Sequence, residues 1–452
     1  MIGCKDCREY KKRIENLEEE LALVKFELEE LRQKRYKSKK RKPPHDNEPP
    51  AALPAKKGGL FGHIGWFRKK PKNIHRTEEV KLYRCPECGS DDIKEYENKI
   101  EEHTQEDIIL PRCETTLFRK QLYYCKRCQK VVCGKGNNEL PGSYVGPTAK
   151  AVAVFLKYGI KISDRDIALL FEKMFNLKVA PSSIVGFRDQ LKNEALPAYE
   201  ALKESLKQGR FIHADETGWR IDGDNAWLWK FSNKKICLTH TDLSRGQKVV
   251  EDMLGKEYKG TLISDFLSAY NKIAAKAKQK CLVHILRDLK KVIKYWRDDG
   301  EVIRYCKRLK NIFEDGIVLH NEYCDKKWGK KYYLRRRLIV RRLDDFSFPN
   351  PNKRIIQRFV KRLNRHKNEV FTFLYEKGID FHNNHAEQQI RPDVIFRKIT
   401  FGNRSLKGAK VHDVLMSVLQ TARLNGLDPI DTLQKILLSA KKNPLSKALA
   451  PP

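Results

Sequence analysis

The sequence predicts an α/β protein in which helices flank a mixed β-sheet, with smaller units ahead of it. Two runs with strand-like alternation, 211–215 and 260–265, each end in an aspartate. Helix-like periodicity dominates residues 149–206 and the interval of about 285–380. Cys-x-x-Cys pairs and a heptad pattern precede these segments. We therefore expect a coiled coil, a metal-binding ribbon, a helical segment and a sheet domain that carries a mostly helical insertion.

Composition indicates a nucleic-acid partner. The 452 residues include 92 Lys and Arg against 58 Asp and Glu, a net charge of +34, and such a field attracts phosphodiester backbone. Eight of the 12 cysteines lie before residue 134, unlike a secreted disulfide framework. No signal pattern opens the chain, and no apolar run approaches the roughly 20 residues that span a bilayer. We expect a soluble, intracellular protein without a membrane partner.

Residues 8–35 carry a heptad pattern. Apolar side chains recur in steps of four and three at Tyr10, Ile14, Leu17, Leu21, Val24, Leu28 and Leu31. This spacing predicts a short parallel coiled coil between two copies, although a surface helix packed on its own domain remains open. Cys4 and Cys7 of two chains could share one zinc ion, whereas a frayed N-terminus is the commoner arrangement.

A linker and a ribbon are expected next. Residues 36–78 are rich in lysine, arginine and proline, which fits either a solvated linker or a disordered arm that grips phosphates, with Trp66 and Phe67 available to stack. Within 79–135, two Cys-x-x-Cys knuckles predict one tetrahedral zinc ion held by Cys85, Cys88, Cys125 and Cys128. Cys113 and Cys133 are spare thiols or substitute ligands.

The segment 146–206 has the outline of a helix-turn-helix. Ser163 and Asp166 form the start of a capping box, and a second helix is expected from about Pro181. Such a pair of helices either reads DNA or merely packs against the rest of the domain.

Three acids are the candidates for chemistry in the segment 207–425. Asp215 and Asp265 are expected to end strands, and Glu387 lies in a helix-compatible stretch bounded by Pro392. Carboxylates from such distant segments can converge over one edge of a mixed sheet, and their oxygens are the ligands that Mg²⁺ or Mn²⁺ prefers. Two such ions suit an in-line displacement at phosphorus. Glu216 and Asp222 are nearby alternatives to Asp215. Residues 426–452 are expected to form a C-terminal tail.

Three motifs resemble the catalytic blocks of the insertion-sequence sixty-six family of DDE transposases. They are His213-Ala214-Asp215-Glu216-Thr217-Gly218-Trp219, Ser264-Asp265-Phe266 and Asn383-Asn384-x-Ala386-Glu387-x-x-Ile390-Arg391-Pro392 with Arg397-Lys398. The motif Gly58-Gly59-Leu60-Phe61-Gly62-His63, the cysteine ribbon and the heptads follow that family's order. The resemblance implies an RNase H-like core in which Asp215, Asp265 and Glu387 hold two Mg²⁺ or Mn²⁺ ions.

Basic residues and a Cys-x-x-His element surround these acids in the sequence. The resemblance implies that the insertion at about 285–380 clamps DNA, through Arg335, Arg336 and Arg341 among others. Arg391, Arg397 and Lys398 either contact phosphate or form a solvated helix face. Cys281 and His284 resemble an element of several transposase families, and a structural or positioning role is preferred over half a zinc site. His382 and His385 are expected to be hydrogen-bonding neighbours rather than zinc ligands.

The resemblance implies a transposase that binds the ends of an insertion sequence and catalyses strand cleavage and strand transfer into target DNA. A homodimer or higher oligomer on DNA, accessory transposition proteins and a nucleoid-associated location in a prokaryotic cytoplasm follow from the same resemblance. Two alternatives are a catalytically silent, transposase-derived DNA-binding protein and an RNase H-like nuclease without strand transfer.

Overall fold

The computed structural model describes the larger part of the chain, at residues 113–119, 122–125, 130–133, 136, 138–346 and 354–438 and at isolated positions between 13 and 28. The predicted arm at 36–78 and the ribbon cysteines Cys85, Cys88 and Cys128 lie outside the described residues. The chain divides into two compact units, Lys34–Pro111 and a unit that joins Met1–Gln33 to Arg112–Pro452. The fold below is that of the second unit.

Two N-terminal predictions fall partly on described residues. Leu17, Leu21, Val24 and Leu28 are helical, with side chains 46–58% exposed, but most of the predicted coiled coil at 8–35 lies outside the described residues and stays a prediction. Strand β1 (Leu122–Cys125) pairs in antiparallel fashion with β2 (Lys130–Cys133). Cys125 therefore ends one strand of a hairpin.

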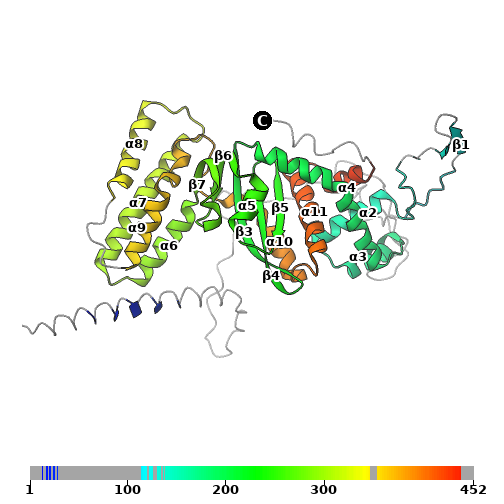
Figure 1. The fold of residues 1–452 in the computed structure, drawn as a ribbon, viewed down its shortest axis with the longest axis horizontal. Coiled ribbons are helices and arrows are strands. Elements are labelled where there is room, and N and C mark those ends of the chain that lie inside the picture. The colour runs from blue at the N-terminus through cyan, green and yellow to red at the C-terminus, as the bar shows by residue number, and fades with distance from the viewer. Residues whose placement is uncertain are drawn as a thin grey trace, which may run out of the picture. The chain divides into compact units, whose positions relative to one another are not determined.

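A five-stranded mixed sheet forms the centre of the fold (Figure 1). Its strands are β3 (Phe211–Ile221), β4 (Asp224–Ser232), β5 (Cys237–Asp242), β6 (Glu257–Ser264) and β7 (Ala274–Lys280), in the spatial order β5-β4-β3-β6-β7. The pairs β3–β4 and β4–β5 are antiparallel, whereas β3–β6 and β6–β7 are parallel. This arrangement confirms the predicted mixed sheet with flanking helices and is consistent with an RNase H-like core.

A two-residue turn joins β3 to β4. Its central residues Asp222 and Gly223 both have positive φ, 52° and 87°, and Ile221 pairs with Asp224 across the turn. Aspartate and glycine adopt this left-handed backbone more readily than other residues, and its twist matches that of the flanking strands. The turn therefore lets β3 run on as a long strand beyond its pairing with β6, which ends at His213.

Helices cover the sheet and share its core. They are α2 (Pro147–Phe155), α3 (Asp164–Phe175), α4 (Pro181–Lys207), α5 (Gln247–Leu254), α10 (Asn384–Thr400), α11 (Leu406–Leu424) and α12 (Pro429–Leu438). Side chains from α4, α11, α12 and strands β3–β6 form one buried hydrophobic cluster. Because α11 packs against β5 and α4, its residues 411–422 are buried all round.

The prediction of a C-terminal tail at 426–452 is wrong for the first residues of that range. Residues Pro429–Leu438 form α12, whose Leu433, Ile436 and Leu437 lie in the main hydrophobic cluster. The apolar residues of this stretch recur at helical spacing, so the helix buries one face against α2 and α4. The remainder, 439–452, lies outside the described residues.

The helix-turn-helix outline matches the observed elements. Ser163 is the N-cap of α3, accepts a hydrogen bond from the Asp166 backbone N–H at 3.1 Å and donates one to the Asp166 carboxylate at 2.7 Å. The second helix begins at Pro181 as predicted. Ile167 and Phe171 of the first helix pack with Ile184 of the second in a small separate cluster.

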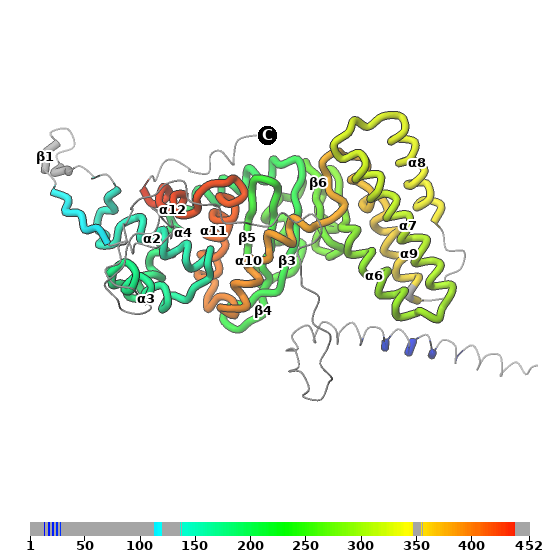
Figure 2. Tube along the Cα trace, turned by 180° about the vertical axis from the view of Figure 1, so that it is seen from behind, coloured from blue at the N-terminus to red at the C-terminus, as the bar shows by residue number. Residues whose placement is uncertain are grey.

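The interval predicted to be a helical insertion contains α6 (Leu282–Tyr295), α7 (Gly300–Tyr323), α8 (Lys330–Asp344), α9 (Arg354–His366) and the short 3₁₀ turns η3 (Lys367–Glu369) and η4 (Thr372–Leu374). These helices have their own hydrophobic cluster and lie together beside the β6–β7 edge of the sheet (Figure 2). The Leu282 N–H donates to the Phe381 carbonyl at 2.9 Å, which joins the two ends of the insertion. Among the described residues, no helix is long and apolar enough to cross a membrane.

Candidate active site

Asp215 lies in the middle of β3, not at the strand end that the sequence predicted. It pairs with Lys230 of β4, and β3 continues to Ile221. The parallel pairing of β3 with β6 stops at His213, two residues earlier. Within the described part of the chain, no strand pairs with β3 at Asp215 on the side that faces β6, and Asp265 follows β6 on that same side.

Asp265 directly follows the last residue of β6, as predicted. Its carboxylate accepts the Leu267 backbone N–H at 2.8 Å, and the short 3₁₀ turn η2 (Ser268–Tyr270) follows. The buried Lys280 ammonium donates to the Asp265 carbonyl at 2.9 Å. Burial lowers the pKa of Lys280 to about 8, and the lysine fixes the backbone at the point where the chain leaves the sheet.

Glu387 lies in the first turn of α10, with its side chain 39% exposed. The sequence predicted a helix bounded by Pro392, but α10 continues through that proline to Thr400. A proline removes one backbone hydrogen bond within a helix. Here Ile390 and Phe396 are buried against the sheet on either side of it, and this packing holds the helix together.

Burial and neighbouring negative charges disfavour the ionised form of Asp215. Burial raises the pKa of Asp215 to about 8, with further contributions from the charges of Glu216, Asp265 and Glu387. Glu387 Oε1 is buried and has no hydrogen-bond partner. Carboxylates that repel one another, one of them with an unpartnered oxygen, fit a hard divalent cation, which would neutralise them. The donor set therefore suits Mg²⁺ or Mn²⁺.

Glu216 belongs to a different set of contacts from Asp215. Its side chain is only 2% exposed, accepts from Arg245 at 2.7 Å and accepts from the Tyr270 hydroxyl at 2.8 Å. Burial and the charge of Asp265 raise the pKa of Glu216, and these two donors lower it. Asp222 is exposed in the β3–β4 turn. The charge of Glu387 contributes to the raised pKa of Asp215.

Asn383, which sequence analysis did not single out, connects the start of α10 to β3 and to the start of α6. Its buried side chain donates to the Ala214 carbonyl at 2.8 Å and accepts from His213 Nδ1 at 3.1 Å. Its backbone N–H donates to Cys281 Sγ at 3.3 Å. Burial and the charge of His385 lower the pKa of His213 to about 4, so this imidazole is neutral near pH 7.

Replacing Asn383 with alanine is expected to lower the unfolding free energy by about 1–3 kcal/mol, because the Ala214 carbonyl and His213 lose buried partners. Urea denaturation of the two proteins measures this difference. Asn384→Ala is the matched control, since Asn384 is the exposed neighbour at the start of the same helix. Equal losses in both variants would contradict a linking role for Asn383.

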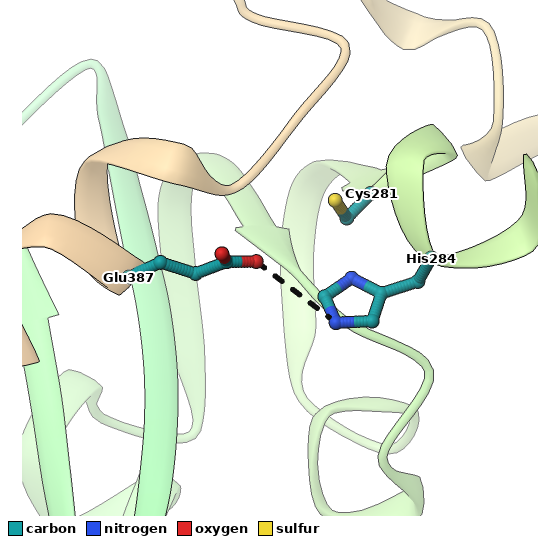
Figure 3. A group of neighbouring side chains, drawn as sticks. All are labelled: Cys281, His284 and Glu387. Carbon is teal, nitrogen blue, oxygen red and sulfur yellow. Dashed lines mark ion pairs between the residues drawn. The ribbon is translucent and has the colours of Figure 1, made fainter. Parts of the chain in front are cut away.

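The structure places Cys281 and His284 beside Glu387 (Figure 3). Cys281 is the fully buried N-cap residue of α6, and His284 Nε2 lies 3.9 Å from Glu387 Oε1. His385 Nε2 instead lies 2.9 Å from the Asn233 carbonyl, a hydrogen bond to the backbone of a neighbouring segment.

The basic residues of α10 differ in their freedom to bind phosphate. Arg397 is half-buried and its Nη1 donates to the Gly218 carbonyl and, at 3.3 Å, to Thr217 Oγ1. Arg391 and Lys398 are exposed. Arg397 therefore ties α10 to β3, and the two exposed cations face solvent.

The predicted clamp residues of α8 also differ among themselves. Arg335 forms an ion pair with Glu322, Arg336 stacks on Tyr375 with its guanidinium 4.1 Å from the ring centre, and Arg341 pairs with Asp345 at 3.3 Å. Arg341 is 75% exposed at its side chain and is the most accessible of the three.

A buried network of charged side chains anchors α10 to β4 and α11. The sequence did not reveal this network. The Asp393 carboxylate binds the Lys230 ammonium at 2.8 Å and His412 Nε2 at 2.9 Å, and all three side chains are fully buried. Burial alone would raise the pKa of Asp393, but Lys230 and His412 hold it at about 2. The network joins β4, α10 and α11 and lies two turns along α10 from Glu387.

A family model described as the transposase IS66 family matches residues 142–411 of this chain. The matched range exceeds half of the chain and includes the three acids, Asn383 and the helical insertion. Comparison with curated proteins gave no match.

Proposed function

Because the chain belongs to the IS66 family of transposases, we propose that it binds the ends of an insertion sequence and catalyses metal-dependent DNA cleavage and strand transfer. Family membership implies transposition, DNA binding and the use of a divalent metal such as Mg²⁺. The assignment of Asp215, Asp265 and Glu387 as metal-binding catalytic residues is the proposal. The observation that carries it is the placement of the three carboxylates: Asp215 lies on β3 just beyond its pairing with β6, Asp265 directly follows β6, and Glu387 lies in the first turn of α10. The charges of Asp265 and Glu387 both act on Asp215.

The three acids would hold a pair of Mg²⁺ or Mn²⁺ ions, which when bound activate the attacking oxygen and stabilise the leaving oxygen at phosphorus. The protein's own groups keep the acids in place. Asn383 fixes the start of α10 against β3, and Lys280 fixes the backbone at Asp265. A water molecule is the nucleophile for cleavage, and the freed 3′-hydroxyl is the nucleophile for transfer.

Exposed cations on α10 and on the helical insertion are proposed to bind the DNA backbone. Arg391 and Lys398 are exposed on the same helix as Glu387, and Arg341, although it pairs with Asp345, is 75% exposed on the helical insertion. Three other arginines contact protein groups and would position α10 and α8 rather than bind DNA: Arg397, Arg335 and Arg336. Phosphate contacts fix the register of DNA without reading its sequence.

The N-terminal predictions complete the proposal. The coiled coil at 8–35 would join two copies so that two transposon ends are held together. The ribbon with Cys85, Cys88, Cys125 and Cys128 would bind Zn²⁺, and α3 and α4 would contact DNA as a helix-turn-helix.

The test is a cleavage assay on labelled terminal-repeat DNA with Mg²⁺ and with EDTA, in wild type and Glu387→Gln. We expect Mg²⁺-dependent nicked and joined products from wild type and neither from Glu387→Gln. Glu257→Gln, at an exposed site where β6 begins, is the matched control and should behave as wild type. Binding without cleavage would identify a silent DNA-binding protein, and cleavage without joined product would identify a nuclease.

A further inference from the structure

Cys281, His284 and Glu387 bring three different donor atoms to one point. Cys281 caps α6, His284 lies in the first turn of α6, and Glu387 lies in the first turn of α10. Their sulfur, nitrogen and oxygen donors all lie within 4.8 Å of one another. Figure 3 shows the Glu387 carboxylate and the His284 imidazole pointing toward each other. The cluster therefore converges although its members come from segments about 100 residues apart.

This donor set differs in chemistry from the three acids. Mg²⁺ and Mn²⁺ prefer oxygen ligands, whereas thiolate with imidazole and one carboxylate suits a borderline transition-metal ion such as Zn²⁺. A tetrahedral site of this kind needs a fourth ligand, and the partial exposure of His284 and Glu387, 32% and 39%, lets a water molecule reach it. The same carboxylate thus lies within reach of two kinds of metal.

Hydrogen bonding leaves the donors available. The Asn383 N–H donates a hydrogen bond to Cys281 Sγ at 3.3 Å. This hydrogen bond is stronger when the acceptor is a thiolate than when it is a thiol. Glu387 Oε1 is buried without any hydrogen-bond partner, and His284 Nε2 lies 3.9 Å from it. An ion between these two atoms would give Glu387 Oε1 the partner that it lacks.

We propose that Cys281, His284 and Glu387 form a binding site for a thiophilic divalent ion such as Zn²⁺, and that its occupation withdraws Glu387 from Asp215 and Asp265. Binding forms a metal–sulfur bond and releases the thiol proton to solvent, with no change of oxidation state. Zn²⁺ therefore acts as an inhibitor of Mg²⁺-dependent cleavage. The inhibitory part rests on the proposed function, whereas the binding site does not.

The binding test uses Co²⁺ as a spectroscopic probe of the full-length protein after removal of bound metal. A cobalt–thiolate bond gives a charge-transfer absorption, and titration gives the number of ions bound. Because the ribbon cysteines are also expected to bind Co²⁺, the informative quantity is the difference in bound Co²⁺ between wild type and each variant. Wild type should bind one more equivalent than Cys281→Ser and than His284→Gln. Cys306→Ser, which removes a buried thiol of α7 far from Glu387 in sequence, should match wild type.

Equal stoichiometry in wild type and in either folded variant overturns the site. His284→Gln carries the test if Cys281→Ser does not fold, since His284 is partly exposed. Asp215→Asn should keep the additional Co²⁺ equivalent, because Asp215 is outside the cluster. A wild-type protein that cleaves no DNA would thus refute the proposed function and leave the binding result intact.

The inhibition test adds Zn²⁺ to the Mg²⁺-dependent cleavage reaction. The Zn²⁺ concentration that halves the rate should rise on the order of tenfold in His284→Gln, with each protein compared to its own rate without Zn²⁺, because one ligand is lost. An unchanged value in His284→Gln would show that Zn²⁺ inhibits elsewhere and would overturn the inhibitory role.

Discussion

Asp215→Asn is expected to abolish Mg²⁺-dependent cleavage and, at the same time, to stabilise the metal-free protein. Loss of a residue that hydrogen-bonds to a metal ligand commonly lowers metal affinity or activity by about 10- to 100-fold. Loss of the ligand itself should therefore lower the cleavage rate by roughly 100-fold or more. The gain in stability has a separate cause. At high pH the Asp215 carboxylate is buried beside Glu216 and Asp265, and asparagine removes that charge while it keeps the shape.

The sign of the pH dependence follows from the two pKa values of Asp215. The folded value is about 8 and the ordinary value is 3.8, so between them the folded state holds a proton that the unfolded state has lost. Stability of metal-free wild type should therefore fall as pH rises from about 4 to about 8 and then level off. Asp215→Asn should lack this decline. Thermal unfolding in EDTA across this pH range measures both curves.

Mg²⁺ gives a second measure of the same site. A ligand that binds only the folded state raises its stability, by about 2.7 kcal/mol at 100 times its Kd. The melting temperature of wild type should rise on addition of Mg²⁺ at pH 8, whereas that of Asp215→Asn should change little. The control is Asp222→Asn in the β3–β4 turn, an exposed position whose positive φ asparagine also tolerates. Persistent cleavage by Asp215→Asn would remove this residue from the site.

The second large effect is expected at the buried network behind α10. Asp393→Asn leaves the Lys230 ammonium without its 2.8 Å partner in a fully buried position. Removing one member of a buried ion pair typically costs about 3–5 kcal/mol, because the remaining charge is uncompensated. Lys230→Met should cost less, since Asp393 retains its hydrogen bond to His412 at 2.9 Å and to Gln420 at 3.3 Å.

A double-mutant cycle separates the pair from its surroundings. Lys230→Met combined with Asp393→Asn should be less destabilising than the sum of the two single changes, because the double variant buries no unpaired charge. Urea denaturation gives the three free energies. Lys234→Met, an exposed lysine just after β4, is the matched control and should change stability by less than about 0.5 kcal/mol. Simple additivity of the single changes would rule out a coupled network.

Local patterns predicted the elements that depend on local interactions. The cap at Ser163 and the start of α4 at Pro181 follow from side chains within a few residues of each helix end, and both are confirmed. The alternation of 260–265 correctly placed Asp265 after a strand. The mixed sheet was predicted from the strand-like runs that end in Asp215 and Asp265 and from the resemblance to the transposase family.

Errors arose where distant contacts decide the structure. Alternation of apolar residues ends at Asp215, but β3 continues because its partner β4 covers it as far as Ile221. Pro392 indicates a helix end by itself, yet burial of Ile390 and Phe396 carries α10 past it. Lys230 lies in an aromatic strand and Asp393 lies 163 positions later, so no local signal connects them. Asn383 is visible in its motif, but its partners are not.

The backbone hydrogen bond between Leu282 and Phe381 brings the two ends of the helical insertion together. Its first and last residues meet at one point of the sheet edge, and its hydrophobic cluster is largely its own. The part of the insertion nearest the sheet is also held by Thr372 and Phe373, which hydrogen-bond to β7, so α7 and α8 are the parts whose length can change with the least effect on the sheet.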